Sequence, residues 1–271
     1  MNFSNILNEI EKADPEVFEK TSDRRNVLKG FGTKIAAAAL PFALGSMFKK
    51  SYGQSTSTIA DVLNFALTLE YLEAKFYEMG LAASGLIPAG APTGAIQTIY
   101  DHEAAHVAFL KTALTSLGAT PVAEPTFDFT AGGTFADVFT SYATFLAVAQ
   151  TFEDTGVRAY KGQAGNLISN NAVLTAALNI HSVEARHASH IRQMRKANGF
   201  GDVKPWITGK NTGIGDLVAA SYNGEEVTTQ AGINIVNING QSISANAASE
   251  AFDEPLTKDQ ILSIVTPFIV P

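Results

Sequence analysis

Between residues 56 and about 198, apolar positions recur at steps of three and four along four successive segments. Side chains with that spacing form one stripe along an α-helix, which is typical of helices that pack in a bundle. Glycine-rich breaks separate the segments at residues 80–94, 118–133 and 162–171. The pattern predicts an all-α protein with a four-helix bundle at residues 56–200, and the longer second gap predicts a crossover between helices two and three.

Charged side chains interrupt each apolar stripe near its middle. The first and third stripes carry Glu70 and Glu153, and the second and fourth carry Glu103-Ala104-Ala105-His106 and Glu184-Ala185-Arg186-His187. A glutamate and a histidine three residues apart point from the same face of a helix. In both halves a tyrosine follows the lone glutamate by seven residues, as Tyr77 and Tyr160. The two halves of the bundle are therefore an internal repeat.

Carboxylates inside an apolar seam are costly to bury unless something neutralises them. Four of them on facing stripes would also repel one another and raise one another's pKa values. Two divalent cations would remove both problems, and two neutral imidazoles would complete the sites. One glutamate from each of two helices and a Glu-x-x-His from each of two others is the ligand set of di-iron and di-manganese bundles. A single Glu-x-x-His is more often an incidental pair on a solvated face, but two copies placed in this way favour metal binding.

Several polar residues on the stripes are candidate partners of these ligands. Glu73 lies one turn after Glu70, whereas Gly156 occupies the equivalent place in the third stripe. It is a candidate substitute ligand or a partner of the ligands. Tyr77 and Tyr160 are candidates to hydrogen-bond the ligand carboxylates, with a redox-active phenol and a packed seam aromatic as the alternatives.

Other histidines lie beside the ligand motifs. His181 comes one turn before Glu184, and it either orients that glutamate or is an exposed histidine. His102 and His190 flank the ligands, and we expect them on the surface. The sequence does not decide whether two aspartates contact the ligands, Asp101 and Asp154.

The composition narrows the chemistry. The chain has no cysteine, which excludes disulfides, Cys-ligated zinc, iron–sulfur clusters and thiol nucleophiles. Any metal must be held by oxygen and nitrogen ligands, which suits iron or manganese, with zinc as a third option. Residues 1–50 hold eight of the 19 Lys/Arg and six of the 26 Asp/Glu, so the remainder is acidic, with 11 against 20. An acidic body without a basic stripe argues against nucleic acid and anionic membranes as partners.

Residues 1–55 have the layout of an export signal and a linker. The segment Asp23-Arg24-Arg25-Asn26-Val27-Leu28-Lys29 precedes an apolar run at residues 35–45 that is too short to span a bilayer. The arginine pair resembles the twin-arginine signal. This resemblance implies export of a folded, metal-loaded protein to the periplasm or cell envelope, without stable membrane insertion beyond the signal. The alternative is a short amphipathic helix with an incidental Arg-Arg.

Residues 201–271 are poor in charge and rich in small polar residues. The segment 233–243 predicts a β-hairpin with a type I′ turn at Asn239-Gly240. Thr257, with Gln260 three residues later, is placed to cap a last short helix that runs to about Pro267. We expect this C-terminal extension to pack on the bundle and not to form a separate catalytic domain.

The four motifs resemble those of the ferritin-like superfamily. From residue 56 onward, including the segment 251–257, the chain resembles a branch that contains desiccation-related and stress-associated proteins. The resemblance implies a centre of two Fe or two Mn ions, held by Glu70, Glu103, His106, Glu153, Glu184 and His187. Superfamily members include iron oxidases, peroxidases, manganese catalases, hydroxylases and proteins without demonstrated catalysis, so the reaction does not follow from the fold.

Three hypotheses for the function follow. The first is redox chemistry in which two metals react with O2 or H2O2, as in an oxidase, peroxidase or catalase. The second is a non-catalytic, stress- or desiccation-protective protein of the cell envelope with a structural or vestigial metal site. The third, iron storage in a cage, suits an exported chain with a long extension poorly. A homo-oligomer is compatible with all three. The absence of a rubredoxin-like cysteine site weakens a self-contained peroxidase.

Overall fold

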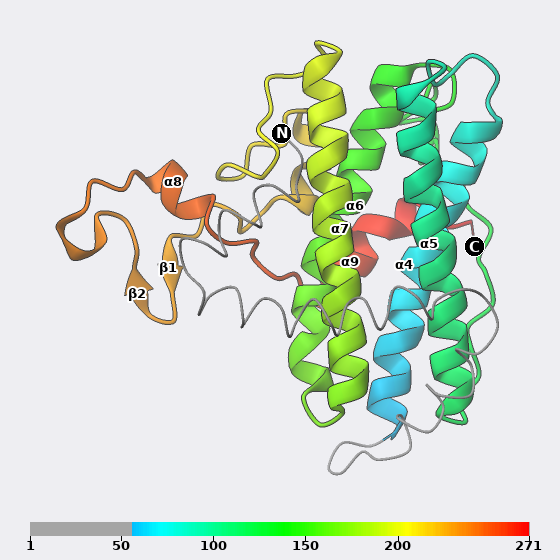
Figure 1. Cartoon of the computed structure of the whole chain (residues 1–271), viewed down its shortest axis with the longest axis horizontal. Coiled ribbons are helices and arrows are strands. Elements are labelled where there is room, and N and C mark those ends of the chain that lie inside the picture. The colour runs from blue at the N-terminus through cyan, green and yellow to red at the C-terminus, as the bar shows by residue number, and fades with distance from the viewer. Residues whose placement is uncertain (1–55, 271) are drawn as a thin grey trace, which may run out of the picture. The chain divides into compact units, whose positions relative to one another are not determined.

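The computed structural model describes residues 56–270 of the chain, so the predicted export signal lies outside the described residues. Four long helices stand side by side in one bundle (Figure 1). They are α4 (Thr56–Ala82), α5 (Ala91–Ser116), α6 (Tyr142–Ala164) and α7 (Asn171–Ala197). Helix α4 packs mainly on α5, and α6 mainly on α7. This arrangement confirms the predicted all-α bundle.

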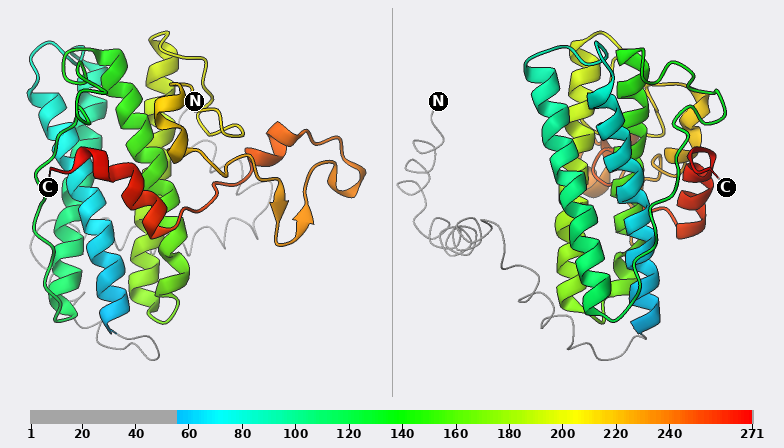
Figure 2. Two further views of the ribbon diagram at one scale, coloured as in Figure 1. Left: turned by 180° about the vertical axis from the view of Figure 1, so that it is seen from behind. Right: turned by 90° about the vertical axis from the view of Figure 1, so that its right-hand side faces the viewer.

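The crossover between α5 and α6 occupies residues 117–141 and returns along the length of the bundle (Figure 2), so these two helices run in the same direction. Helix α6 begins at Tyr142, three residues after Phe139. The reason is local: the Ser141 side chain accepts a hydrogen bond from the Thr144 backbone N–H and caps the helix there. Phe139 packs on the core from the turn that precedes the helix.

The core at one end of the bundle is built from aromatic rings. Phe76 of α4 stacks on Phe145 of α6 with ring centroids 4.8 Å apart, and Phe129 of the crossover meets Phe76 edge to face. Gly80 makes the stacking possible, because a Cβ there would lie 2.3 Å from the Phe145 ring. Aromatic pairs of these geometries stabilise beyond their buried area by about 0.5–1.5 kcal/mol.

Within the bundle, a single 3-10 turn, η1 (Gly165–Leu167), lies between α6 and α7. The C-terminal extension contains short elements, which are, in chain order, the 3-10 helix η2 (Asp216–Ser221), strands β1 (Thr229–Gln230) and β2 (Ile233–Asn234), the 3-10 helix η3 (Ile238–Gly240), helices α8 (Ala245–Ser249) and α9 (Lys258–Val265), and the 3-10 helix η4 (Thr266–Phe268). Helix α9 lies across the outside of the bundle and packs on α6 (Figure 2). It begins with the predicted Thr257–Gln260 capping box. After α9, backbone hydrogen bonds join residues 268–270 to the crossover, with the Val270 N–H donating to the Thr126 carbonyl.

The predicted hairpin at residues 233–243 was placed wrongly. The structure pairs β1 with β2, with Gln230 opposite Ile233, through a turn at Ala231-Gly232. Both turn residues have positive φ, as a type I′ turn requires. Residues 237–243 instead form a loop closed by two hydrogen bonds between Asn237 and Ile243. Apolar and polar residues alternate at residues 233–235, but Ile233 is exposed, so no buried face fixes the strand register there.

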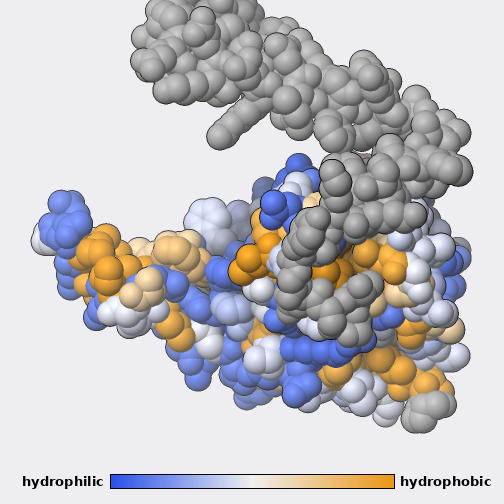
Figure 3. All heavy atoms as spheres, turned by 90° about the horizontal axis from the view of Figure 1, so that it is seen from below, coloured by the Kyte–Doolittle hydropathy of each residue, from blue (hydrophilic) through white to orange (hydrophobic). Residues whose placement is uncertain are grey.

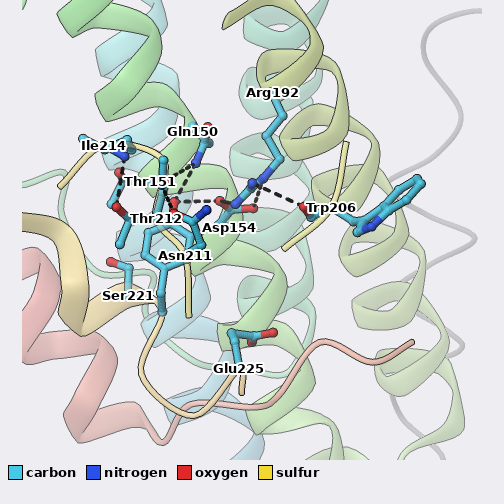
Figure 4. Close-up of polar contacts among 12 residues, drawn as sticks. Gln150, Thr151, Asp154, Arg192, Trp206, Asn211, Thr212, Ile214, Ser221 and Glu225 are labelled. Atoms are coloured by element: carbon cyan, nitrogen blue, oxygen red, sulfur yellow. Dashed lines mark hydrogen bonds and ion pairs between the residues drawn. The ribbon is translucent and has the colours of Figure 1, made fainter. Parts of the chain in front are cut away.

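Buried polar side chains on the outer faces of α6 and α7 fasten the extension to the bundle (Figure 4). Arg192 donates to the Asp154 carboxylate, and the Tyr222 hydroxyl donates to the same group at 2.7 Å. Gln150 donates to the Thr212 carbonyl. Asp154 therefore belongs to this network and not to the predicted ligand partners.

Arg158 of α6 is the second anchor of the extension. Its guanidinium donates to the backbone carbonyls of Asn223 and Glu254 and lies 2.7 Å from the Glu225 carboxylate. An arginine presents several donors in a fixed plane, which suits it to gathering separate chain segments around one buried position. The extension is thus attached to the bundle by polar contacts as well as by α9.

The extension also presents apolar side chains to solvent, including Leu217, Ile233 and Phe252. The arm that carries β1, β2 and α8 projects from the bundle, and apolar residues lie on its surface (Figure 3). Among the described residues, no helix has the length and apolar character needed to cross a membrane.

Candidate metal centre

The six predicted ligands converge in the middle of the bundle. Their four glutamates are completely buried. Their donor atoms form two groups, each with all atoms within 4.8 Å of one another: Glu70, Glu103, His106 and Glu184 in one, and Glu103, Glu153, Glu184 and His187 in the other. Glu103 and Glu184 belong to both groups. The arrangement is therefore two adjacent clusters joined by two shared carboxylates.

The histidine Nδ1 atoms mark the two clusters. His106 Nδ1 lies 3.1 Å from Glu70, 3.0 Å from Glu103 and 3.2 Å from Glu184. His187 Nδ1 lies 2.7 Å from Glu103 and 3.3 Å from Glu153. One ring nitrogen cannot serve three oxygens with three full hydrogen bonds, since it carries at most one proton. Oxygen and nitrogen atoms gathered around one point are, by contrast, how proteins hold a cation.

Several of these atoms are buried without a hydrogen-bond partner. They are Glu103 Oε1, Glu153 Oε2, both Glu184 carboxylate oxygens and His187 Nδ1. Short distances such as that between His187 and Glu103 thus bring atoms together without the geometry of a hydrogen bond. Buried polar groups are almost always satisfied, and a carboxylate left alone is especially costly. The residues fit a pair of metal ions, which would satisfy all of these atoms at once.

Protons neutralise the cluster when metal is absent. Burial raises the pKa of Glu103 to about 7. Burial and the charge of Glu103 raise the pKa of Glu184 well above its usual range. Burial lowers the pKa of His187, but the charges of Glu153 and Glu103 outweigh burial and raise that pKa to about 11. Metal binding must displace these protons.

Tyr77 and Tyr160 reach across the repeat. The Tyr77 hydroxyl, from α4, donates to Glu153 of α6 at 2.5 Å, and the Tyr160 hydroxyl, from α6, donates to Glu70 of α4. Burial, with the charge of the accepting glutamate, raises the pKa of each phenol well above its usual value, so both stay protonated donors. These two hydrogen bonds between α4 and α6 agree with the prediction that both tyrosines donate to ligand carboxylates.

Glu73 is also brought into the cluster's surroundings. It is buried, and burial together with the charge of Glu184 raises the pKa of Glu73 well above its usual range. It does not belong to either group of converging donor atoms. Its carboxylate faces Gly156 beside Glu184.

Two histidines make contacts that the sequence did not predict. His102 was predicted to lie on the surface, and its side chain is largely exposed, but its Nδ1 lies 2.9 Å from His187 Nε2 and the two rings stack. The sequence carried one signal of this contact: the repeat is broken here, because Val183 stands in the second half where His102 stands in the first. His181 does not orient Glu184: its Nδ1 lies 2.9 Å from the Val157 carbonyl. His190 and Asp101 are exposed, as expected for His190.

Comparison with known proteins agrees with this geometry. Residues 58–197, just over half of the chain, match the family model described as a ferritin-like domain. A comparison with curated proteins finds no match. The matched residues cover nearly the whole bundle and include both clusters. The chain therefore belongs to the family of proteins with a ferritin-like domain.

Proposed function

We propose that the bundle holds two Fe or two Mn ions for redox chemistry with O2 or H2O2, as part of oxidative-stress defence. The six proposed ligands are Glu70, Glu103, His106, Glu153, Glu184 and His187. The observation that carries the proposal is the pair of clusters joined by Glu103 and Glu184, with buried oxygen atoms that have no hydrogen-bond partner. Two adjacent metal sites with shared carboxylates suit transfer of electrons in pairs.

Two such ions, when bound, supply the electrons and the Lewis acidity for reducing or dismutating the oxidant. The chain's own residues do the positioning. Tyr77 and Tyr160 hold one oxygen of Glu153 and Glu70, which leaves the second oxygen of each carboxylate directed at the cluster. Apolar side chains of all four helices surround the site and exclude bulk water, which strengthens every electrostatic interaction within it.

One cavity favours O2 as the oxidant. A cavity of about 20 Å³ lies among apolar side chains, including Leu63, Phe109 and Ile180, and it is also lined by Tyr160. A water molecule in this cavity would find few polar partners, because most of the lining is apolar. A cavity next to Tyr160 thus suits a small apolar molecule on its way to Glu70, the glutamate to which Tyr160 donates.

We further propose that the protein acts outside the cytoplasm, in the periplasm or cell envelope, after export by the twin-arginine route. The support is the sequence at residues 23–45, which lies outside the described residues. Loading the metal before export would suit this site, since its four glutamates are buried in the folded bundle.

The test is turnover by protein loaded with Fe(II) or Mn(II). O2 consumption at an electrode by the Fe-loaded protein, or O2 release from H2O2 by the Mn-loaded protein, is the expected result. Both should disappear in Glu184→Ala, whereas His190→Ala, an exposed histidine on the same helix, should keep the activity. Metal bound at two ions per chain without turnover would contradict the redox role and favour the non-catalytic, protective one.

A further inference from the structure

The two halves of the bundle differ at one position that faces the metal centre. Glu70 aligns with Glu153 and Tyr77 aligns with Tyr160 in the repeat, so Glu73 aligns with Gly156. Glu73 is only 3% exposed. It therefore adds a fifth buried carboxylate to one half of the centre, and the other half has no side chain at that place.

Gly156 provides the space that Glu73 uses. A Cβ at Gly156 would lie 3.2 Å from Glu73 Oε1 and 3.3 Å from Glu184 Oε2, which is tighter than most contacts of that type. Gly156 lies within α6, and its φ is not positive, so backbone conformation does not demand a glycine there. The glycine is explained by room for two carboxylates that meet over it.

Nothing else in the structure explains why Glu73 is buried. None of the described residues donates a hydrogen bond to its carboxylate, and after burial the charges that raise the pKa of Glu73 most are those of other glutamates, Glu184 and Glu153 first. Its side chain also borders a small hollow lined by Leu72, Phe152 and Val265, where α9 covers the bundle.

Charge balance indicates what a fifth carboxylate would do. Four glutamates and two neutral imidazoles balance two divalent ions, but two trivalent ions would leave two positive charges uncompensated in a dry interior. Uncompensated charge away from water is costly, and a nearby carboxylate removes part of that cost. We propose that Glu73 is a fifth carboxylate of the metal centre and gives it a preference for trivalent over divalent ions. This inference rests on the proposed dinuclear site.

The test compares a trivalent with a divalent ion, neither of which changes its oxidation state during the measurement. Ga3+ and Mn2+ are titrated into wild-type protein and Glu73→Gln in competition with a chelator of known affinity. Loss of an outer partner of a metal site typically weakens binding by about 10–100-fold, and we expect a loss of that size for Ga3+ with less than about a threefold change for Mn2+. Glu78→Gln is the matched control, because that glutamate lies on the same helix with its side chain 51% exposed.

The double variant Glu73→Gly/Gly156→Glu separates a charge effect from a structural one. It moves the carboxylate to the equivalent place in the other half of the repeat, and we expect it to recover the Ga3+ preference while still binding two Mn2+ per chain. If Glu73→Gln loses the same affinity for both ions, or loses none for either, the proposed role of Glu73 is overturned, but the dinuclear site is not. Wild-type protein that binds neither ion would overturn the dinuclear site as well.

Discussion

The two halves of the bundle agree at the six proposed ligands and the two tyrosines that contact them, but they differ on the outside. Facing the centre, α4 and α6 each carry a glutamate followed by a tyrosine, and α5 and α7 each carry a glutamate and a histidine. On the outer side, every residue of α6 from Val148 to Tyr160 is buried, whereas α4 exposes Glu78 and leaves Lys75 half-buried. We infer that the proposed centre requires the same residue types on the inner faces of both halves. The outer faces of α6 and α7 differ from those of α4 and α5 because the extension packs on them.

The largest expected effect comes from the aligned pair Arg158 and Lys75. Arg158 is buried, with its side chain 1% exposed, and it contacts Glu225 and three backbone carbonyls of the extension. The Lys75 side chain, by contrast, is 37% exposed beside Glu78. Removing one partner of a buried ion pair costs about 3–5 kcal/mol, and an exposed pair contributes about 0–1 kcal/mol. Arg158→Ala should therefore lower the free energy of unfolding in urea far more than Lys75→Ala. Equal losses would contradict the different roles of the two outer faces.

The next effect tests whether the two clusters are separate sites. His106 belongs to one group of donor atoms and His187 to the other, while Glu103 belongs to both. We expect His106→Ala and His187→Ala each to weaken one ion by about 100-fold or more, beyond the loss typical of an outer partner. Each variant should retain one ion per chain in equilibrium dialysis, and Glu103→Ala should retain none. Loss of both ions in either histidine variant would show that the sites bind only as a unit.

A smaller effect is expected from the crossed tyrosines. Tyr77→Phe and Tyr160→Phe each remove one hydroxyl that donates to a proposed ligand. Both should weaken metal binding by about 10–100-fold, and by similar amounts, because the repeat gives them equivalent positions. Calorimetric titration with Mn2+ would measure both losses. A loss of affinity in one variant only would mean that the two tyrosines are not equivalent, although their hydrogen bonds are.

The smallest effect concerns His102, which has no equivalent in the second half. Its contact with His187 Nε2 fixes the orientation of that ring, so His102→Ala should weaken the ion at His187 by about tenfold. Val183→Ala, at the aligned position, should leave the affinity unchanged. An unchanged affinity in His102→Ala would mean that the ring is held by packing alone.

The sequence predicted the bundle and the converging residues because both follow from short-range periodicity. A glutamate and a histidine three residues apart must share a helix face, and a repeat of that motif limits where the faces can meet. The packing of the extension could not be predicted in this way. Asp154 and Arg158 are fixed by Arg192 and by partners at residues 221–254, far away in the chain, and no local pattern marks them.

The hairpin shows the same limit from the other side. Its alternating pattern lay in an exposed segment, where no buried face selects one register, so the turn formed at Ala231-Gly232 instead of Asn239-Gly240. His102 is exposed, as predicted, but its contact with His187 was not predicted, because exposure and a contact with the centre are compatible for a side chain at the edge of a bundle.

The most direct test of the central claim is elemental analysis of the protein purified from its native host, beside Glu103→Ala/His106→Ala. We predict about two Fe or Mn ions per wild-type chain, the number typical of this ligand set, and their loss in a variant that remains folded. Folded wild-type protein that contains no metal, even after Fe or Mn is supplied, would contradict the dinuclear centre.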